Sequence, residues 1–371
     1  MMRDDIHWPP EWPRALDARF GIPVAGGYRA CAEDFVVEEC LDFAPEGQGE
    51  HLWLWVEKRN AATSDVARQL ALQCEVGSRD IGYAGMKDRV AVTRQWFSVH
   101  LPGREAPEDL VEGLTERGFK VLNMTRHPRK LKRGVHRGNR FTLRLNGAVT
   151  QDESLEQRWQ AIVAEGVPNY FGPQRFGSDG RNLFRARDLL ARGWRKRDDR
   201  EGMLLSAARS FLFNAQLAER LVAGQWRTVL NGDVMMLDGT QSMFAVEAQD
   251  SELQQRLISG DIHPTAVLWG QGGSRAMGDA EQLEQKALAC WPGLCNGLER
   301  AAVKASRRAL RVRPSEGLLQ RDADGVTLEF TLPSGAFATA VLRELMSHPT
   351  LDFDTLPDAR AAEQGMNGEP Q

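Results

Sequence analysis

The sequence has no long apolar run and no apolar amino-terminal segment. No stretch approaches the roughly 18 apolar residues that a membrane-spanning helix needs. The amino terminus, M-M-R-D-D-I-H-W-P-P, carries acids and prolines where a signal peptide would carry an apolar core. We therefore expect a soluble, cytoplasmic protein that has no membrane partner.

Metal ligands and nucleotide-binding loops are also scarce. The five cysteines are odd in number and include no C-x-x-C pair, which argues against a disulfide framework and a zinc site. We expect them to be reduced, buried thiols. The seven histidines include no pair at ligand spacing, and the segments 82–85 and 270–273 lack the pattern of a phosphate-binding loop. We predict no metal and no cofactor.

The net charge is −4, but the charges are unevenly distributed along the chain. Ten lysines or arginines and no acid lie between Arg117 and Gln151. A second basic cluster spans Arg300 to Arg313, and a third, mixed with acids, spans Arg175 to Arg200. If these stretches meet in space, they form a positive face for a polyanion. Otherwise they are three separate solvated faces.

Hydrophobic periodicity divides the chain into two strand-rich flanks and a helical middle. Alternating or β-branched segments predict strands over 35–40, 51–58, 91–99, 119–124, 139–145 and 325–332. Helical spacing predicts helices over 60–75, 155–164, 182–192, 203–223, 279–289 and 338–346, the first capped by Thr63 or Ser64. We expect an α+β fold with a discontinuous domain (1–155 and 305–350), a mainly helical insertion (156–304) and a polar tail (351–371).

One loop carries a candidate catalytic group. In I-G-Y-A-G-M-K-D-R-V-A-V-T-R-Q-W-F-S-V, residues 81–99, two glycines bracket a short loop that ends in Lys87, Asp88 and Arg89. A carboxylate held in such a loop between two cations is ionised at neutral pH and can be presented to a ligand. This pattern indicates that Asp88 is a nucleophile or a base. The alternative is an ordinary solvated turn.

Three phenylalanines, Phe35, Phe141 and Phe337, stand beside glycine or charged turns. Each of them suits a core position, but the same placement suits stacking on a displaced nucleobase, so we count them as candidate substrate-binding residues. Asn139 has an amide that both donates and accepts, and it can therefore read the edge of a uracil ring. Its alternative role is that of a turn-forming residue.

Five segments of the chain resemble those of the TruD family of tRNA pseudouridine synthases. They are E-D-F-V-V-E-E (33–39), A-G-M-K-D-R-V-A-V-T-R-Q (84–95), R-G-N-R-F (137–141), V-P-N-Y-F-G-P-Q-R-F-G (167–177) and L-P-S-G-A-F-A-T-A-V-L-R-E-L (332–345). The second and the fourth are long enough to be specific. The loop from Leu237 to Gly273 and the tail after His348 carry no motif that can be placed.

The resemblance implies a pseudouridine-synthase catalytic domain, a mixed sheet with flanking helices, and an inserted domain characteristic of TruD. It implies that Asp88 is the catalytic aspartate and that Phe35, Asn139 and Phe337 contact the target nucleotide. It also implies that Asn169 opens the inserted domain near the same cleft. The implied substrate is tRNA, at the uridine in position thirteen, and no obligate protein partner is implied.

The chemistry of this reaction agrees with the residues available. Converting uridine to pseudouridine requires a flipped base, an aromatic ring and one carboxylate, but neither redox chemistry nor phosphate energy. Arg29 or Lys87 would keep Asp88 ionised when RNA excludes water. Whether Asp88 attacks the sugar, abstracts a sugar proton or adds to the base stays open. A non-catalytic RNA-binding protein is the main alternative, and a hydrolase is weaker because a second carboxylate and metal ligands are missing.

Overall fold

The computed structural model describes residues 4–194, 199–323 and 325–353. These residues form two units. The first, called the sheet unit here, comprises Gly26–Glu153 and Pro314–Gly335. The second, called the helical unit, comprises the described parts of Met1–Ala25, Ser154–Arg313 and Ala336–Gln371. The sheet unit therefore combines segments from both sides of the helical middle.

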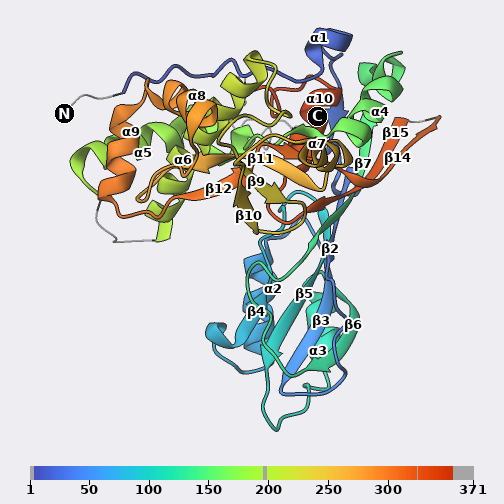
Figure 1. Cartoon of the computed structure of the whole chain (residues 1–371). Helices are drawn as coiled ribbons and strands as arrows, with labels where there is room; N and C mark the ends of the chain where they lie inside the picture. The colour runs from blue at the N-terminus through green and yellow to red at the C-terminus, as the bar shows by residue number, and fades with distance from the viewer. Residues whose placement is uncertain (1–3, 195–198, 324, 354–371) are drawn as a thin grey trace, which may run out of the picture. The chain divides into compact units, whose positions relative to one another are not determined.

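A nine-stranded mixed sheet forms the framework of the sheet unit (Figure 1). Its strands are β1 (Gly27–Tyr28), β2 (Phe35–Cys40), β3 (His51–Arg59), β4 (Ile81–Tyr83), β5 (Val92–His100), β6 (Phe119–His127), β7 (Gly138–Asn146), β14 (Ser315–Asp322) and β15 (Gly325–Pro333). The order is β14-β15-β7-β2-β5-β3-β6, with β1 paired to β7 and β4 paired to β5. β2 and β5 are parallel, whereas β15 pairs antiparallel with β7 along its whole length. The carboxy-terminal flank thus extends the sheet that the amino-terminal flank begins.

Alternating burial explains why these segments form strands. In β2, the inward residues are Phe35, Val37 and Glu39, and the residues between them are only half-buried. The helices α2 (Thr63–Gln73) and α3 (Leu110–Glu116) contribute apolar residues to a core that they share with β3, β4, β5 and β6. An acid at the third inward position of β2 is unusual, because a buried carboxylate needs a partner.

The helical unit surrounds a long central helix, α6 (Asp199–Val222). Its other helices are α1 (Asp17–Phe20), α4 (Leu155–Glu165), α5 (Arg181–Arg192), α7 (Ser251–Ser259), α8 (Gly278–Leu288), α9 (Pro292–Arg300) and α10 (Ala338–Leu345). A four-stranded antiparallel sheet has the order β10 (Met243–Ala245), β9 (Val234–Leu237), β11 (Ile262–Leu268) and β12 (Ser306–Ala309). A short pair joins β13 (Arg311–Val312) to β8 (Val167–Pro168).

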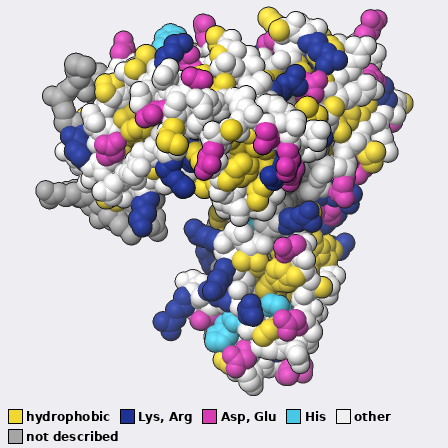
Figure 2. All heavy atoms as spheres, viewed as in Figure 1, with side chains coloured by type: hydrophobic (Ala, Val, Ile, Leu, Met, Phe, Trp, Pro, Cys, Tyr) yellow, Lys and Arg dark blue, Asp and Glu magenta, His cyan; other side chains and the backbone are white. Residues whose placement is uncertain are grey.

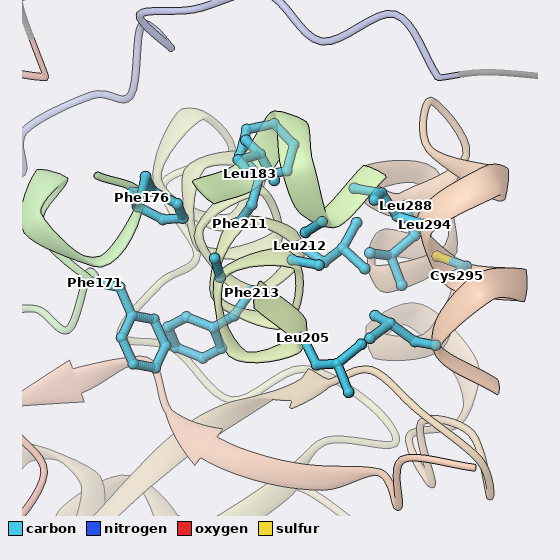
Figure 3. Close-up of a cluster of buried hydrophobic side chains, with 14 of the residues drawn as sticks. Phe171, Phe176, Leu183, Leu205, Phe211, Leu212, Phe213, Leu288, Leu294 and Cys295 are labelled. Atoms are coloured by element: carbon cyan, nitrogen blue, oxygen red, sulfur yellow. The ribbon is translucent and has the colours of Figure 1, made fainter. Parts of the chain in front are cut away.

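Aromatic packing on α6 fixes the segment that follows β8. The rings of Phe171 and Phe213 pack edge to face with their centroids 5.6 Å apart, and Figure 3 shows them side by side in the apolar core. The side-chain amide of Asn214 accepts from the Phe171 backbone N–H at 2.9 Å and donates to its carbonyl at 2.8 Å. This segment is therefore held by both its side chain and its backbone.

The α+β class, the mixed sheet and the mainly helical middle that the sequence predicts are confirmed. The four-stranded sheet in the middle was not predicted. β11 reads I-H-P-T-A-V-L and buries its first six residues on both faces, so it shows no alternation, and Pro264 argues against a strand. Among the described residues, no helix has the length and apolarity to cross a lipid bilayer.

Two further expectations need correction. The polar tail was expected from residue 351, but Leu351 and Phe353 are each 1% exposed, and Phe353 packs edge to face on Trp12. The rest of that expected tail lies outside the described residues. The cysteines were all expected to be buried, but Cys31 and Cys290 are exposed.

Candidate active site

Asp88 lies in the loop that connects β4 to β5, as the sequence suggested. The two glycines of this segment were expected to act as hinges, but neither has a positive φ. Position 82 requires glycine for steric reasons instead, because a Cβ there would lie 2.3 Å from the carbonyl oxygen of Leu131. The loop is therefore closely packed against the chain that follows β6.

Buried polar side chains fix the backbone of this loop. The hydroxyl of Thr63 accepts from the N–H of Lys87 at 3.0 Å and donates to the side-chain oxygen of Gln95 at 2.8 Å. The amide of Gln95 donates to the carbonyl of Gly85 at 3.1 Å. Thr63 thus positions the loop, and the Asp65 carboxylate accepts the N–H at the start of α2 instead.

Lys58 holds the backbone of Asp88 itself. Its side chain is buried in β3, and its ammonium donates to the carbonyl oxygen of Asp88 at 2.8 Å and to that of Ala61 at 2.6 Å. Burial lowers the pKa of Lys58 to about 8, and the charge of Lys87 contributes to the shift while Asp88 opposes it. A buried ammonium that donates to these backbone carbonyls fixes the position of the loop.

The carboxylate of Asp88 meets Arg29. Nη2 of Arg29 lies 3.3 Å from Oδ1 of Asp88, and its guanidinium carbon lies 3.6 Å from the ring centroid of Phe35. The Asp88 side chain is 39% exposed, whereas that of Arg29 is 16% exposed. Arg29 has a φ of 64°, a strained conformation for a residue that has a Cβ. The arrangement presents a carboxylate to solvent with a cation on one side.

Arg29 covers one of the candidate aromatic residues of the sheet unit. Phe35 is 1% exposed, and its face is covered by the Arg29 guanidinium. Phe141 packs edge to face on Phe35 at 6.2 Å and stacks on Phe330 at 5.4 Å. Phe141 is therefore a core residue in this structure, and contact with a base at Phe35 requires displacement of Arg29.

Lys87 does not serve as the cation beside Asp88. Its ammonium lies 2.7 Å from Oε2 of Glu39, and both side chains are almost fully buried. Glu39 also accepts from the backbone N–H of Trp96 at 3.2 Å. Burial raises the pKa of Glu39, and the charge of Lys87 opposes this shift. The two cations predicted on either side of Asp88 are thus replaced by one contact, from Arg29, and one buried ion pair behind the loop.

Asn139, the second residue of β7, has a partly unpaired side-chain amide. It lies opposite Glu39 in β2 and Leu332 in β15, and its buried Oδ1 has no hydrogen-bond partner among the described residues. Nearby, His136 is within 3.1 Å of the hydroxyl of Ser334, and burial lowers its pKa to about 4. Asn139 therefore has an unused acceptor close to the amino-terminal end of β7, and reading a nucleobase requires such a group.

Asn169 and Phe337 lie in the helical unit. Asn169 is 6% exposed, and its amide donates to the carbonyl of Ala309 at 2.9 Å and accepts from Arg308 at 2.5 Å. Its side chain is thus engaged within the protein. The ring of Phe337 is half-buried, with its centroid 5.8 Å from that of Phe171.

The longest basic stretch folds against the loop that carries Asp88. The N–H of Gly134 donates to the carbonyl of Ala84 at 2.8 Å, while Arg129, Lys132 and Arg133 are exposed. Figure 2 shows Lys and Arg side chains gathered on the β4 side of the sheet unit. This surface suits a polyanion that approaches Asp88.

Only part of the second basic cluster is a solvated face, since Arg300 and Lys304 are exposed but Arg307 and Arg311 are buried. Arg307 forms a buried ion pair with Glu284 at 2.5 Å, and Arg311 is buried and donates to His263 at 3.1 Å. These arginines stabilise the helical unit. In the part of the chain that the structure describes, no three His, Cys, Asp or Glu side chains form a group that could hold a metal ion.

Glu39, Lys58 and Thr63 were not singled out from the sequence. Glu39 and Lys58 look like the solvent face of amphipathic strands, and Thr63 looks like a helix cap. Only the pairing of β2 and β3 with β5 brings them behind Asp88. The weak signal available was the run of consecutive acids Glu38 and Glu39, which breaks the alternation of β2.

Comparisons with known proteins found a family model and named relatives that match most of this chain. The family model described as tRNA pseudouridine synthase D (TruD) matches residues 21–196 and 198–345. A Chromohalobacter salexigens protein named tRNA pseudouridine synthase D is 56% identical over 346 residues, which cover 93% of this chain and 98% of that protein. A protein of the same name from Stutzerimonas stutzeri is 46% identical over 339 residues, with coverage of 90% and 96%.

The fold is also similar to that of a solved structure. A Methanosarcina mazei crystal structure, provisionally assigned as a tRNA pseudouridine synthase D, superimposes with a TM-score of 0.67. The match covers 92% of this chain and 96% of the other, with 20% sequence identity. At that identity the likeness concerns the fold alone.

Proposed function

Because the chain belongs to the TruD family of tRNA pseudouridine synthases, we propose that it acts on the uridine at position thirteen of certain tRNAs and that Asp88 is the catalytic group. The reaction of the family isomerises uridine to pseudouridine. The bond between C1′ of the ribose and N1 of uracil breaks, and a bond between C1′ and C5 forms. N1 gains a proton and C5 loses one, so atoms and electrons balance without a cofactor.

The observation that carries this proposal is the contact between Arg29 and Asp88. A guanidinium nitrogen lies 3.3 Å from the carboxylate oxygen, so a cation stands beside the group that would act as nucleophile or base. Because the Asp88 side chain is 39% exposed while its backbone is held by Lys58, the carboxylate is accessible yet positioned. Such a group can act on a nucleotide that has left its helix.

The other candidate residues take complementary roles in the proposal. Phe35 would provide a ring for the displaced base, and Asn139 would read its polar edge. Phe337, in the helical unit, stays a candidate for contact with the RNA substrate. Phe141 packs edge to face against Phe35 and supports its position. Lys87 acts through its ion pair with Glu39, and Asn169 acts by positioning Arg308, so neither needs to touch the base.

We propose the same functional division of the chain as the sequence suggested. Residues 1–155 and 305–350 would carry the catalytic domain, and residues 156–304 would be the insertion characteristic of the family. The exposed basic residues near Asp88 would bind phosphates of the tRNA, which gives affinity without base specificity. The protein would act in the cytoplasm, where its substrate is found, and would need no obligate protein partner.

The test uses unmodified tRNA labelled with tritium at C5 of its uridines. Because C5 loses its hydrogen when the new bond forms, conversion of one uridine releases one equivalent of tritium into water. We expect stoichiometric release with the purified protein alone, in buffer treated with EDTA and then supplied with Mg²⁺ only to fold the tRNA. A tRNA that carries cytidine at position thirteen is the matched control and should release none.

Three outcomes would contradict the proposal. Binding of the tRNA without tritium release would indicate a protein that binds RNA but does not modify it. Equal release from the cytidine control would place the reaction at another uridine. A requirement for one specific divalent ion in the chemical step, once the tRNA is folded, would overturn the cofactor-free chemistry.

A further inference from the structure

The helical unit contains two arginines that share two aromatic rings. The guanidinium carbon of Arg308, in β12, lies 4.3 Å from the ring centroid of Phe171 and 5.7 Å from that of Phe337. The guanidinium carbon of Arg175 lies 5.4 Å and 5.9 Å from the same two centroids. Two positive charges are therefore concentrated beside the half-buried ring of Phe337.

Both arginines are held by their surroundings, Arg308 through its side-chain hydrogen bonds and Arg175 through its backbone and its ring contacts. Arg308 donates to Oδ1 of Asn169 at 2.5 Å, and Asn169 is itself buried and bonded to Ala309. Arg175 ends the short 3-10 turn Pro173–Arg175, and the next residue, Phe176, is fully buried. A ligand that binds here meets side chains that have already lost much of their conformational freedom.

The local charge is not balanced at Arg175. In the ranges that the structure describes, its guanidinium makes no hydrogen bond and no ion pair, and its contacts are with the two rings. Burial lowers the pKa of Arg175, and burial together with the charge of Arg175 lowers that of Arg308 to about 9. A bound anion would relieve the repulsion between the two guanidinium groups.

We propose that Arg175 and Arg308 together bind one phosphodiester of the RNA substrate, next to the nucleotide that contacts Phe337. The planar guanidinium donates two parallel hydrogen bonds to a phosphate, and two such groups can share one anion. A nucleotide supplies both a phosphate for the arginines and a base for the adjacent ring, which a free anion does not. The inference rests on the proposed function only for the identity of the ligand as RNA.

The first experiment measures tRNA affinity as a function of salt for the full chain and for Arg175→Gln. Loss of one phosphate contact should weaken binding about tenfold and reduce the slope of log affinity against log salt by about 0.7–0.9. Arg192→Gln removes the same charge from an exposed position of α5 and is the matched control, which should leave both quantities unchanged. Arg175→Lys should keep the salt slope but lower the affinity, because an ammonium lacks the planar pair of donors that a guanidinium presents to phosphate. Equal slopes for Arg175→Gln and the wild type would overturn the proposal.

The second experiment locates the phosphate. Single neutral methylphosphonate linkages are placed, one at a time, on either side of the target uridine and at three neighbouring positions. We expect the wild type to lose about tenfold in affinity at one linkage, and Arg175→Gln to be insensitive at that linkage, since both changes remove the same contact. Additive losses at every linkage would show that Arg175 and the RNA backbone do not meet.

Thermal unfolding controls for folding and for free phosphate. If inorganic phosphate at fixed ionic strength raised the unfolding temperature of the wild type but not of Arg175→Gln, and every methylphosphonate were neutral, the site would bind free phosphate and the RNA assignment would be wrong. These measurements report binding rather than turnover. They therefore remain informative if no tritium is released. That result would contradict the proposed function but not the phosphate site.

Discussion

The guanidinium of Arg29 bridges the carboxylate of Asp88, at 3.3 Å, and the ring of Phe35, whose centroid lies 3.6 Å from the guanidinium carbon. One side chain thus sets the electrostatics of the candidate catalytic group and covers the aromatic surface on which a base would stack. The site therefore contains a candidate reacting group, Asp88, and a side chain, Arg29, that must move before a base can stack on Phe35. The two functions can be separated by substitution.

Asp88→Asn should abolish conversion of uridine while leaving tRNA affinity within about threefold of the wild type. The amide keeps the shape of the side chain but has no negative charge to act as nucleophile or base, whereas affinity comes mainly from phosphate contacts. Single-turnover tritium release and filter binding measure the two quantities, with thermal unfolding as the control for folding. A residue that only capped a turn would instead lose stability and activity in proportion. Near wild-type conversion by the folded variant would remove Asp88 from the mechanism.

Arg29→Lys should lower the single-turnover rate by more than tenfold and change tRNA affinity little. The ammonium keeps the charge but cannot lie flat on Phe35 while it contacts Asp88. Arg59→Lys is the matched control, because Arg59 is exposed and pairs with the exposed Glu33. If both variants reacted at the wild-type rate, the contact of Arg29 with Asp88 would be incidental.

The buried ion pair of Glu39 and Lys87 predicts an asymmetric response of stability. Lys87→Met leaves an unpaired carboxylate in the interior and should cost about 3–5 kcal/mol of unfolding free energy. The double variant Glu39→Gln with Lys87→Met removes both charges and should recover a large part of that loss. Denaturant unfolding of the two single variants and the double variant measures the coupling. Strictly additive losses would show that the two side chains do not interact.

The basic loop should dominate the salt dependence of tRNA binding. Replacing Arg129, Lys130, Lys132 and Arg133 by Ala removes up to four counterion-releasing contacts and should flatten the salt slope by about 3. The backbone of the loop is anchored by Leu131 and Gly134, which the substitutions do not touch. An unchanged slope would mean that this loop does not meet the RNA.

The sequence was most informative where one strand face is buried and the other is solvated. β2, β3, β5, β7 and β15 follow from alternation and β-branched content, and the mixed sheet follows from the family resemblance. The sheet of the helical unit was not predicted, because β11 is buried on both faces and contains Pro264. Neither periodicity nor composition therefore indicates a strand there.

Only part of the candidate site could be predicted from the sequence, for a related reason. Asp88 stands in a loop between charges, a local signal, whereas its supporting residues depend on strand register. Lys58 looks like a solvated lysine at the end of an amphipathic strand, and Arg29 has no local feature that predicts its positive φ. Long-range pairing decides such positions, and one sequence does not encode it in any short window.

Lys58 offers the sharpest remaining test of how the loop is positioned. Its ammonium donates to the carbonyls of Asp88 and Ala61, and its pKa is lowered to about 8. We expect the single-turnover rate to fall as pH rises from about 7 to 9, because the neutral amine holds the two carbonyls less strongly. Lys58→Met should be slower by about 10–100-fold at all pH values and should lose this alkaline decline.

Stability should move in the opposite direction over the same pH range. The ordinary pKa of a lysine, 10.5, lies above the folded value of about 8, so between these two values the unfolded chain binds more protons than the folded one. The contribution of Lys58 to the unfolding free energy therefore rises with pH in that window, even as the rate falls. Loss of rate through general loosening of the fold would make both quantities fall together. Lys58→Arg stays charged and should shift the decline beyond the range measured, and Lys120→Met, at an exposed position of β6, is the control for removal of a lysine. If Lys58→Met kept the wild-type rate and alkaline decline at saturating enzyme, the ammonium would have no part in positioning Asp88.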